Sequence, residues 1–164
     1  MSQAYVSIGS NIDKDKHIPA GLQTLARCFG ELTLSSVYES EAVGFVSDVF
    51  YNLVVCFKTE LSVKDVARQL RQIELDNGRT RDCQKFSART LDLDLLLYDD
   101  LIINEGRLQI PRDEIEHYAF VLEPLAEIAP DLKHPISYLT YAQLWEQFDK
   151  SKLKQTRVKP DWAN

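Results

Sequence analysis

Two aspartates in a leucine-rich stretch are the residues of this chain best suited to chemistry. They are Asp92 and Asp94, within the sequence RTLDLDL at 89–95. Because side chains alternate along a strand, both acids would share one face, roughly 7 Å apart. Like charges this close raise each other's pKa unless a positive charge intervenes. Mg²⁺ takes one or two carboxylates together with substrate phosphates, so the pattern predicts a magnesium–nucleotide site.

A simpler interpretation of the same stretch stays open. The acids could belong to a half-exposed edge strand and pair with Arg89 and Arg81. Short motifs of this kind are hypotheses until their structural context is known.

Composition narrows the class of ligand. The chain has 164 residues, with 45% hydrophobic residues and a net charge of −6, which fits one soluble domain with a core of its own. The negative charge argues against general nucleic-acid binding. A local basic cluster, Arg79, Arg81, Lys85 and Arg89, instead favours a small anionic ligand.

Cysteine usage and the N-terminus bear on the compartment. The three cysteines, Cys28, Cys56 and Cys83, are widely spaced and form no CxxC motif, which favours a reducing compartment over a disulfide framework or zinc site. The N-terminus has no apolar leader, and no apolar run is long enough to span a membrane. We expect a cytoplasmic protein.

Hydrophobic periodicity predicts an α+β fold. Strands are expected at 4–8, 32–38, 50–58 and 91–98, and amphipathic helices at 18–29 and from Ser62 to Gly78. Short extended segments at 101–103 and 108–110 and helices at 113–128 and 140–148 follow. The βαββαβ order predicts a ferredoxin-like antiparallel sheet with helices on both sides. We expect a single domain over 1–164, and for the polar tail from about residue 150 both disorder and a surface course stay open.

The missing motifs also restrict the chemistry. The chain has no GxxxxGK[ST], GxGxxG or GxSxG sequence and only six glycines. A bound nucleotide would therefore need metal ions and arginine side chains to neutralise its phosphates. Phosphoryl transfer requires little beyond such neutralisation and correct positioning.

Four motifs in order carry a resemblance to a known family. They are IGSN at 8–11, IEL at 73–75 followed by Gly78 and Arg79, RTLDLDL at 89–95, and FVLEPL at 120–125. From about Ala4 to Asp131 the chain resembles 6-hydroxymethyl-7,8-dihydropterin pyrophosphokinase. The resemblance implies transfer of pyrophosphate from ATP to a pterin alcohol, with release of AMP, in folate biosynthesis.

The resemblance also implies a role for individual residues. Asp92 and Asp94 would hold two Mg²⁺ ions, and Arg79 and Arg89 would steady the transferring group as catalytic residues. The pterin would be bound by Ser40, Val43, Asn52, Phe86 and Phe120. Positions near ATP are Arg71, Glu74, Arg81, Leu95, Arg107, Gln109 and Arg112. The loops at 40–49 and 79–88 would close over the substrates.

The chain departs from the family pattern at three positions. Arg112 stands where a histidine is usual, Tyr118 where an arginine is usual, and Arg71 where glutamine is frequent. We expect Arg112 to contact the triphosphate in place of the histidine. Two alternatives stay open: a paralogue that binds nucleotide or pterin with little or altered activity, and a two-metal hydrolase. We expect a monomer that binds neither nucleic acid nor membrane.

Overall fold

The computed structural model describes residues 1–40, 49–78, 90–151 and 153–163. Its main element is an antiparallel sheet of strand order β5-β1-β4-β3-β8, with β2 also paired to β4. The strands are β1 (Ser2–Ser10), β2 (Thr33–Leu34), β3 (Val37–Ser40), β4 (Phe50–Thr59), β5 (Asp92–Tyr98) and β8 (Gln155–Val158). A separate hairpin pairs β6 (Ile103–Glu105) with β7 (Leu108–Ile110).

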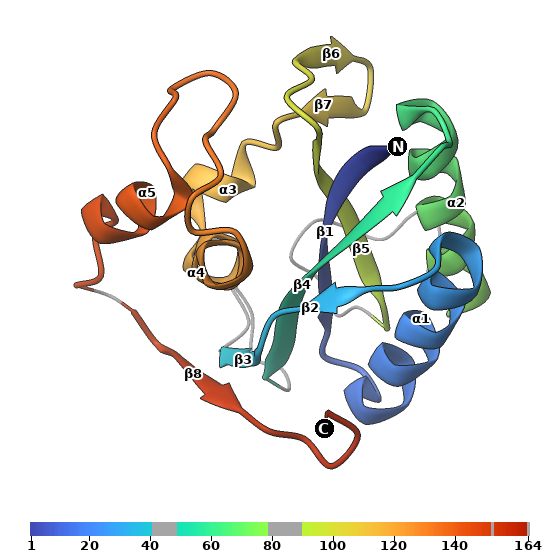
Figure 1. Cartoon of the computed structure of the whole chain (residues 1–164). Coiled ribbons are helices and arrows are strands. Elements are labelled where there is room, and N and C mark those ends of the chain that lie inside the picture. Colours follow the sequence, from blue (N-terminus) through green and yellow to red (C-terminus); the bar gives the residue numbers. More distant parts are fainter. Residues whose placement is uncertain (41–48, 79–89, 152, 164) are drawn as a thin grey trace.

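Helices cover both faces of this sheet, as Figure 1 shows. On one face lie α1 (Lys14–Phe29) and α2 (Val63–Asp76). On the other lie α3 (Glu114–His117), α4 (Ala119–Ile128) and α5 (Tyr141–Gln147). The order β1-α1-β2/β3-β4-α2-β5 gives the predicted ferredoxin-like α+β fold, which is confirmed.

Strand alternation divides the buried side chains between two cores. In β4, Val55 and Phe57 pack under α1 and α2, whereas Val54 and Cys56 pack under α4 and α5. The sheet is therefore apolar on both faces, as a central layer covered by helices must be. At Tyr5–Val6 of β1 the register with β5 shifts, and the adjacent Leu96 and Leu97 both join the α4–α5 core.

Side-chain caps stabilise the N-termini of α2 and α5. The Ser62 hydroxyl accepts a hydrogen bond from the Asp65 backbone N–H at 3.2 Å, as an N-cap does. At α5, Thr140 and Gln143 form a capping box, each side chain bonding the other's backbone N–H. None of the helices in the described ranges is long and apolar enough to cross a bilayer.

Two predicted elements are divided in the structure. The helix expected over 113–128 breaks at Tyr118, whose backbone is extended (φ −124°, ψ 123°). The strand expected over 32–38 is interrupted at Ser35, whose hydroxyl accepts from the Val54 N–H at 2.9 Å. At Ser35 the side chain therefore replaces a backbone group as the hydrogen-bond acceptor, so the strand is not continuous.

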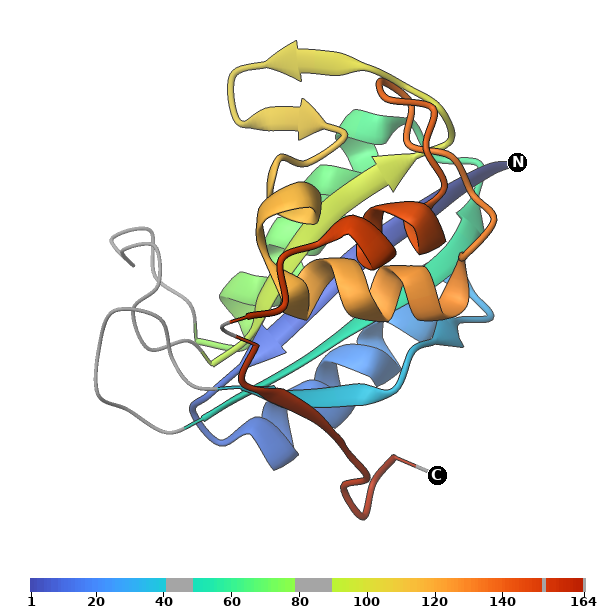
Figure 2. The ribbon, with the colours of Figure 1, turned by 90° about the vertical axis from the view of Figure 1, so that its left-hand side faces the viewer.

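The polar tail contributes a strand to the sheet. β8 pairs antiparallel with β3, and Gln155 lies opposite Ser40. Figure 2 shows this segment crossing in front of the sheet edge below α4. Farther on, the Trp162 indole N–H donates to Asp15 of α1 at 2.8 Å. The C-terminal segment thus links β3 to α1, which periodicity did not predict.

Candidate active site

The two aspartates lie on one face of the edge strand β5. In the register of the sheet, Asp92 is opposite Gly9 and Asp94 is opposite Ser7 of β1. The alternating residues Leu91, Leu93 and Leu95 are buried in the α1–α2 core. Both carboxylates therefore belong to the opposite face, on the side of α3 and α4, and both are partly exposed.

A single transverse row of the sheet connects this acid pair to the expected pterin residues. Gly9 pairs with Asp92 on one side and with Asn52 of β4 on the other. Directly opposite residues in antiparallel strands point to the same face, and two strand spacings amount to roughly 10 Å. Because Gly9 has no side chain, no side chain stands between the Asp92 and Asn52 positions.

Gly9 also fits closely against Asn52. A Cβ atom at position 9 would lie 2.8 Å from the Asn52 Oδ1 atom. Asn52 is buried (5% exposed), and its amide N–H donates to the Ser40 hydroxyl at 3.4 Å. The IGSN motif marked this stretch in the sequence, but a role for Gly9 requires the strand register and was missed.

Arg112 brings a positive charge to the acid pair. Its Nη2 atom is 3.5 Å from Asp94 Oδ1, and its Nε donates to Glu114 Oε2 at 2.8 Å. Its backbone N–H donates to the Leu96 carbonyl at 3.0 Å, which fixes residue 112 beside β5. Burial lowers the pKa of the guanidinium, but Asp94, Glu114 and Asp92 outweigh burial and raise it above its ordinary value.

Glu74 joins α2 to β5 beneath the acids. It is buried (5% exposed), and its Oε2 atom accepts from the Leu93 backbone N–H at 2.8 Å. Leu93 lies between the two aspartates on an edge strand, where backbone N–H groups lack a strand partner on one side. The carboxylate satisfies one of these groups and so fixes the strand segment that carries the acids.

A cavity of about 530 Å³ opens beside these residues. It is bounded by α2, β5 and the β6–β7 hairpin, and it includes Asp94 at the acid pair. The lining residues that were expected near ATP are Arg71, Glu74, Leu95, Arg107, Gln109 and Arg112. Leu70, Leu93 and Leu108 supply an apolar part. Arginines beside an apolar wall suit a ligand with an anionic end and a flat apolar end.

Phe120 and Tyr118 form an aromatic pair where α3 meets α4. Their ring centroids are 5.0 Å apart and the planes differ by 21°. Both side chains are partly exposed and pack against the α4–α5 core. A face of this pair is the kind of surface on which a planar heterocycle can stack.

Five expected site residues lie outside the described residues: Val43, Arg79, Arg81, Phe86 and Arg89. They include both expected catalytic arginines. Their roles, and the alternative pairing of the acids with Arg81 and Arg89, stay predictions.

The donor set fits a hard divalent cation. In the described ranges no group of three or more histidine, cysteine, aspartate or glutamate side chains is arranged to hold a metal ion. Two carboxylates on one strand face are instead the number that Mg²⁺ uses when substrate phosphates complete its coordination.

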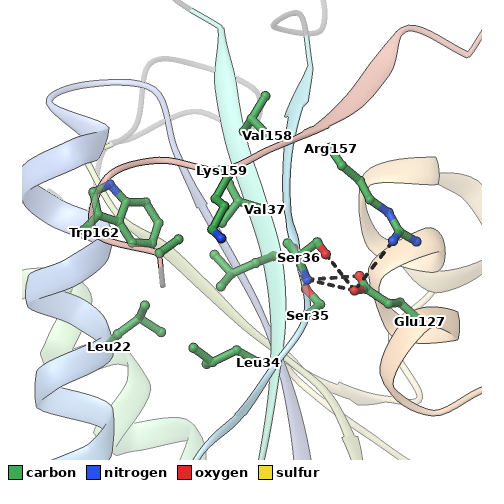
Figure 3. Close-up of a pocket in the computed structure, with 12 residues that line it drawn as sticks. Leu22, Leu34, Ser35, Ser36, Val37, Glu127, Arg157, Val158, Lys159 and Trp162 are labelled. Atoms are coloured by element: carbon green, nitrogen blue, oxygen red, sulfur yellow. Dashed lines mark hydrogen bonds and ion pairs between the residues drawn. The ribbon is translucent and has the colours of Figure 1, made fainter.

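A second cavity, of about 570 Å³, contains none of the expected site residues. Figure 3 shows it between Leu22 of α1, Leu34 and the C-terminal segment that carries Lys159 and Trp162. Cavity size alone would therefore not have identified the site on β5.

Comparison with known proteins identifies the family. The family model described as 7,8-dihydro-6-hydroxymethylpterin-pyrophosphokinase matches residues 5–130. The chain belongs to this family.

Two curated relatives, each named 2-amino-4-hydroxy-6-hydroxymethyldihydropteridine pyrophosphokinase, come from Haemophilus influenzae and Synechocystis. The first is 36% identical over 93% of this chain and 97% of its own length. The second is 39% identical over 89% of this chain and 76% of its own length.

Solved structures agree on the fold. Plasmodium falciparum HPPK-DHPS superposes with a TM-score of 0.72 at 16% identity, covering 98% of this chain. An HPPK-DHPS solved in complex with substrates gives a TM-score of 0.77 at 12% identity, covering 97% of this chain. The chain spans about half of each of those longer chains, 48% and 46%. At such identities the likeness establishes the fold of this pyrophosphokinase family member.

Proposed function

We propose that this pyrophosphokinase family member transfers pyrophosphate from ATP to 6-hydroxymethyl-7,8-dihydropterin in folate biosynthesis. The hydroxymethyl oxygen attacks the β-phosphorus of ATP, the bond from that phosphorus to the α-phosphate oxygen breaks, and AMP leaves. The proton of the attacking hydroxyl is released to water. Family membership and the sequences of the curated relatives support this reaction.

The transverse row Asp92–Gly9–Asn52 is the observation that carries the proposal. It brings the acid pair within roughly 10 Å of a buried amide, along one face of the sheet. An asparagine amide offers both donors and an acceptor, as the edge of a pterin ring requires. A pterin bound at Asn52 can thus direct its hydroxymethyl group toward phosphates held at β5. Phe120, Ser40, Val43 and Phe86 would complete this site.

The carboxylates of Asp92 and Asp94 would hold two Mg²⁺ ions. Ions held by these two residues would supply positive charge to neutralise the charge that develops on the phosphates. Arg112, Arg71 and Arg107 would bind the polyphosphate from the cavity side, while Leu95 and its apolar neighbours would contact the nucleoside. Arg79 and Arg89 would stabilise the transferring group.

One observation favours a second candidate, a paralogue that binds nucleotide or pterin with little or altered activity. The Arg112 guanidinium is already 3.5 Å from Asp94. The guanidinium of Arg112 would compete with a metal ion for the carboxylate of Asp94.

An assay with ATP, Mg²⁺ and 6-hydroxymethyl-7,8-dihydropterin separates these candidates. AMP that forms only when the pterin is present supports the pyrophosphokinase. Saturable binding of ATP or pterin without AMP supports the paralogue. Inorganic phosphate released without the pterin would contradict both.

We further propose that residues 1–164 act as one domain and as a monomer in a reducing compartment. The described cysteines, Cys28 and Cys56, are free thiols. Light scattering of the purified chain measures its mass in solution, and a mass of about twice 18.8 kDa would contradict the monomer.

A further inference from the structure

A side chain of β8 reaches the helix turn that carries Phe120. The Gln155 Nε2 atom donates to the Ala119 backbone carbonyl at 3.1 Å and to Glu123 Oε1 at 2.7 Å. Ala119 precedes Phe120, and Glu123 follows it by three residues, at the start of α4. Gln155 itself lies beyond residues 5–130, the range that the family model matches.

This turn of α4 has one helical hydrogen bond fewer than usual. Pro124 lies inside the helix and has no N–H, so the carbonyl of Phe120, four residues earlier, receives no bond from it. The bonds from Gln155 therefore hold a turn whose own ladder is incomplete.

The same residue contacts the other wall of the expected pterin site. Gln155 lies opposite Ser40 in the β3–β8 pairing, and the Ser40 hydroxyl accepts from the buried Asn52 amide. Gln155 thus joins the Phe120 turn through its side chain to the strand that supports Asn52 through the β3–β8 backbone pairing.

The far end of α4 is anchored separately. Glu127 accepts hydrogen bonds from the Ser36 hydroxyl at 2.7 Å and the Tyr38 hydroxyl at 2.8 Å. Figure 3 shows Glu127 directed at Ser36, with Arg157 on its other side. Because this anchor does not involve Gln155, loss of Gln155 should loosen the first turn while the helix stays on the sheet.

We propose that Gln155 is a positioning residue for the pterin, which sets the place of Phe120 relative to Asn52. The inference rests on the proposed function, since it concerns the acceptor of that reaction. It predicts that changes at residue 155 act on the KM for the pterin and leave the KM for ATP unchanged, because the nucleotide cavity lies on the β5 side of the sheet.

The first test replaces Gln155 by leucine, which removes both donated bonds at similar size. We expect the KM for the pterin to rise about tenfold, as for loss of a hydrogen bond to a charged group. The KM for ATP should stay within about twofold and the unfolding temperature should be little changed. Thr156→Ala, at the adjacent exposed position of β8, is the matched control and should match the unaltered protein.

The second test, Gln155→Glu, gives a signature that a structural role would not. It opposes two carboxylates at the 2.7 Å contact, which can share a proton only at low pH. The other charged or titratable groups facing this contact are Tyr38 of β3, Glu127 of α4 and Arg157 of β8. Burial first, and then Glu127, raise the pKa of Tyr38, so it stays neutral, and Arg157 stays positive. The KM for the pterin in this variant should therefore rise as pH increases from about 5 to 8.

The exchange Gln155→Glu with Glu123→Gln restores an amide–carboxylate bond between the two positions. A carboxylate at position 155 cannot donate to the Ala119 carbonyl, so the exchange should recover only part of the pterin affinity at pH 8. An unchanged KM for the pterin in Gln155→Leu, a parallel rise in both KM values with a lower unfolding temperature, or no recovery in the exchange would overturn the inference. If the unaltered protein makes no AMP at all, the proposed function fails and the inference falls with it. If the unaltered protein forms AMP normally and Gln155→Leu has the same KM for the pterin, the inference is overturned and the proposed function stands.

Discussion

Arg112 is the residue at which this chain differs most informatively from the family pattern. The sequence led us to expect a cation for the triphosphate, and the structure adds that the guanidinium lies between Asp94 and Glu114. Such a group can offset the charge of Asp94 before the ligand arrives and can turn to phosphate oxygens afterwards. Arginine presents several hydrogen-bond donors in a rigid planar group, which suits both carboxylates and phosphates.

If Arg112 contacts the triphosphate, Arg112→Ala should raise the KM for ATP about tenfold, the scale of one lost charge-assisted contact. Steady-state kinetics at saturating pterin measure it. Arg68→Ala is the control, because Arg68 is exposed on α2 and pairs only with Asp65 among the described residues. Equal ATP KM values in Arg112→Ala and the unaltered protein would refute the contact.

The acid pair makes a stronger prediction. Asp92→Asn and Asp94→Asn should each lower AMP formation about a hundredfold or more, because each removes a carboxylate ligand for magnesium and its charge. Asp100→Asn, at an exposed turn after β5, should leave the rate unchanged. Full activity in either site variant would rule out that carboxylate as a metal ligand.

At the scale of elements, the site depends on how α2 is joined to the edge strand β5. Amphipathic spacing and the Ser62 cap predicted α2, and the alternation of leucine and aspartate predicted β5. The bond from Leu93 to Glu74 could not be predicted, because it depends on how two elements meet in space. In the structure Glu74 accepts a hydrogen bond from the backbone of β5, a contact that no local sequence pattern indicates.

Removing this connection should cost stability. Glu74→Ala leaves the buried Leu93 N–H without that acceptor, and we expect a loss of about 2 kcal/mol in the free energy of unfolding. Glu74→Gln keeps an acceptor oxygen and should lose clearly less. Urea denaturation followed by circular dichroism measures both, and equal losses in the two variants would contradict this role.

At the scale of the whole molecule, the order of elements along the chain and the fold class could be predicted from the sequence, because the two-residue and 3.6-residue periods are local. What escaped prediction depends on long-range pairing. β8 has no strong hydrophobic period and is a strand because β3 offers a free edge. Gly9 matters only because the register places it opposite Asn52. In the candidate site, the motif residues could be named from the sequence. The contacts by which Glu74, Gly9 and Gln155 support them could be recognised only in the folded structure.

The buried His134 should make the free energy of unfolding depend on pH. His134 is buried (3% exposed), and its Nδ1 accepts from the Ile136 and Ser137 N–H groups at 3.2 and 3.3 Å. Burial lowers its pKa from the ordinary 6.5, although Glu116 opposes the shift. The unfolded chain therefore binds the proton more readily, so the stability from His134 is present above about pH 6.5 and is lost as pH falls through the folded-state pKa.

The variant His134→Asn should reduce this dependence, because asparagine can accept similar hydrogen bonds and does not titrate. Free energies of unfolding measured from pH 7.5 down to 5 should fall less steeply in His134→Asn than in the unaltered protein. Parallel curves would show that His134 does not contribute.

If β5 presents ATP to the pterin as proposed, the two terminal phosphates of ATP are transferred as one group. ATP labelled with ³²P at the γ-position, incubated with Mg²⁺ and 6-hydroxymethyl-7,8-dihydropterin, follows those phosphates directly. We expect label on the pterin, in an amount equal to the unlabelled AMP formed, and both lowered about a hundredfold or more in Asp92→Asn. Label recovered as free phosphate, or on the pterin together with ADP, would contradict it.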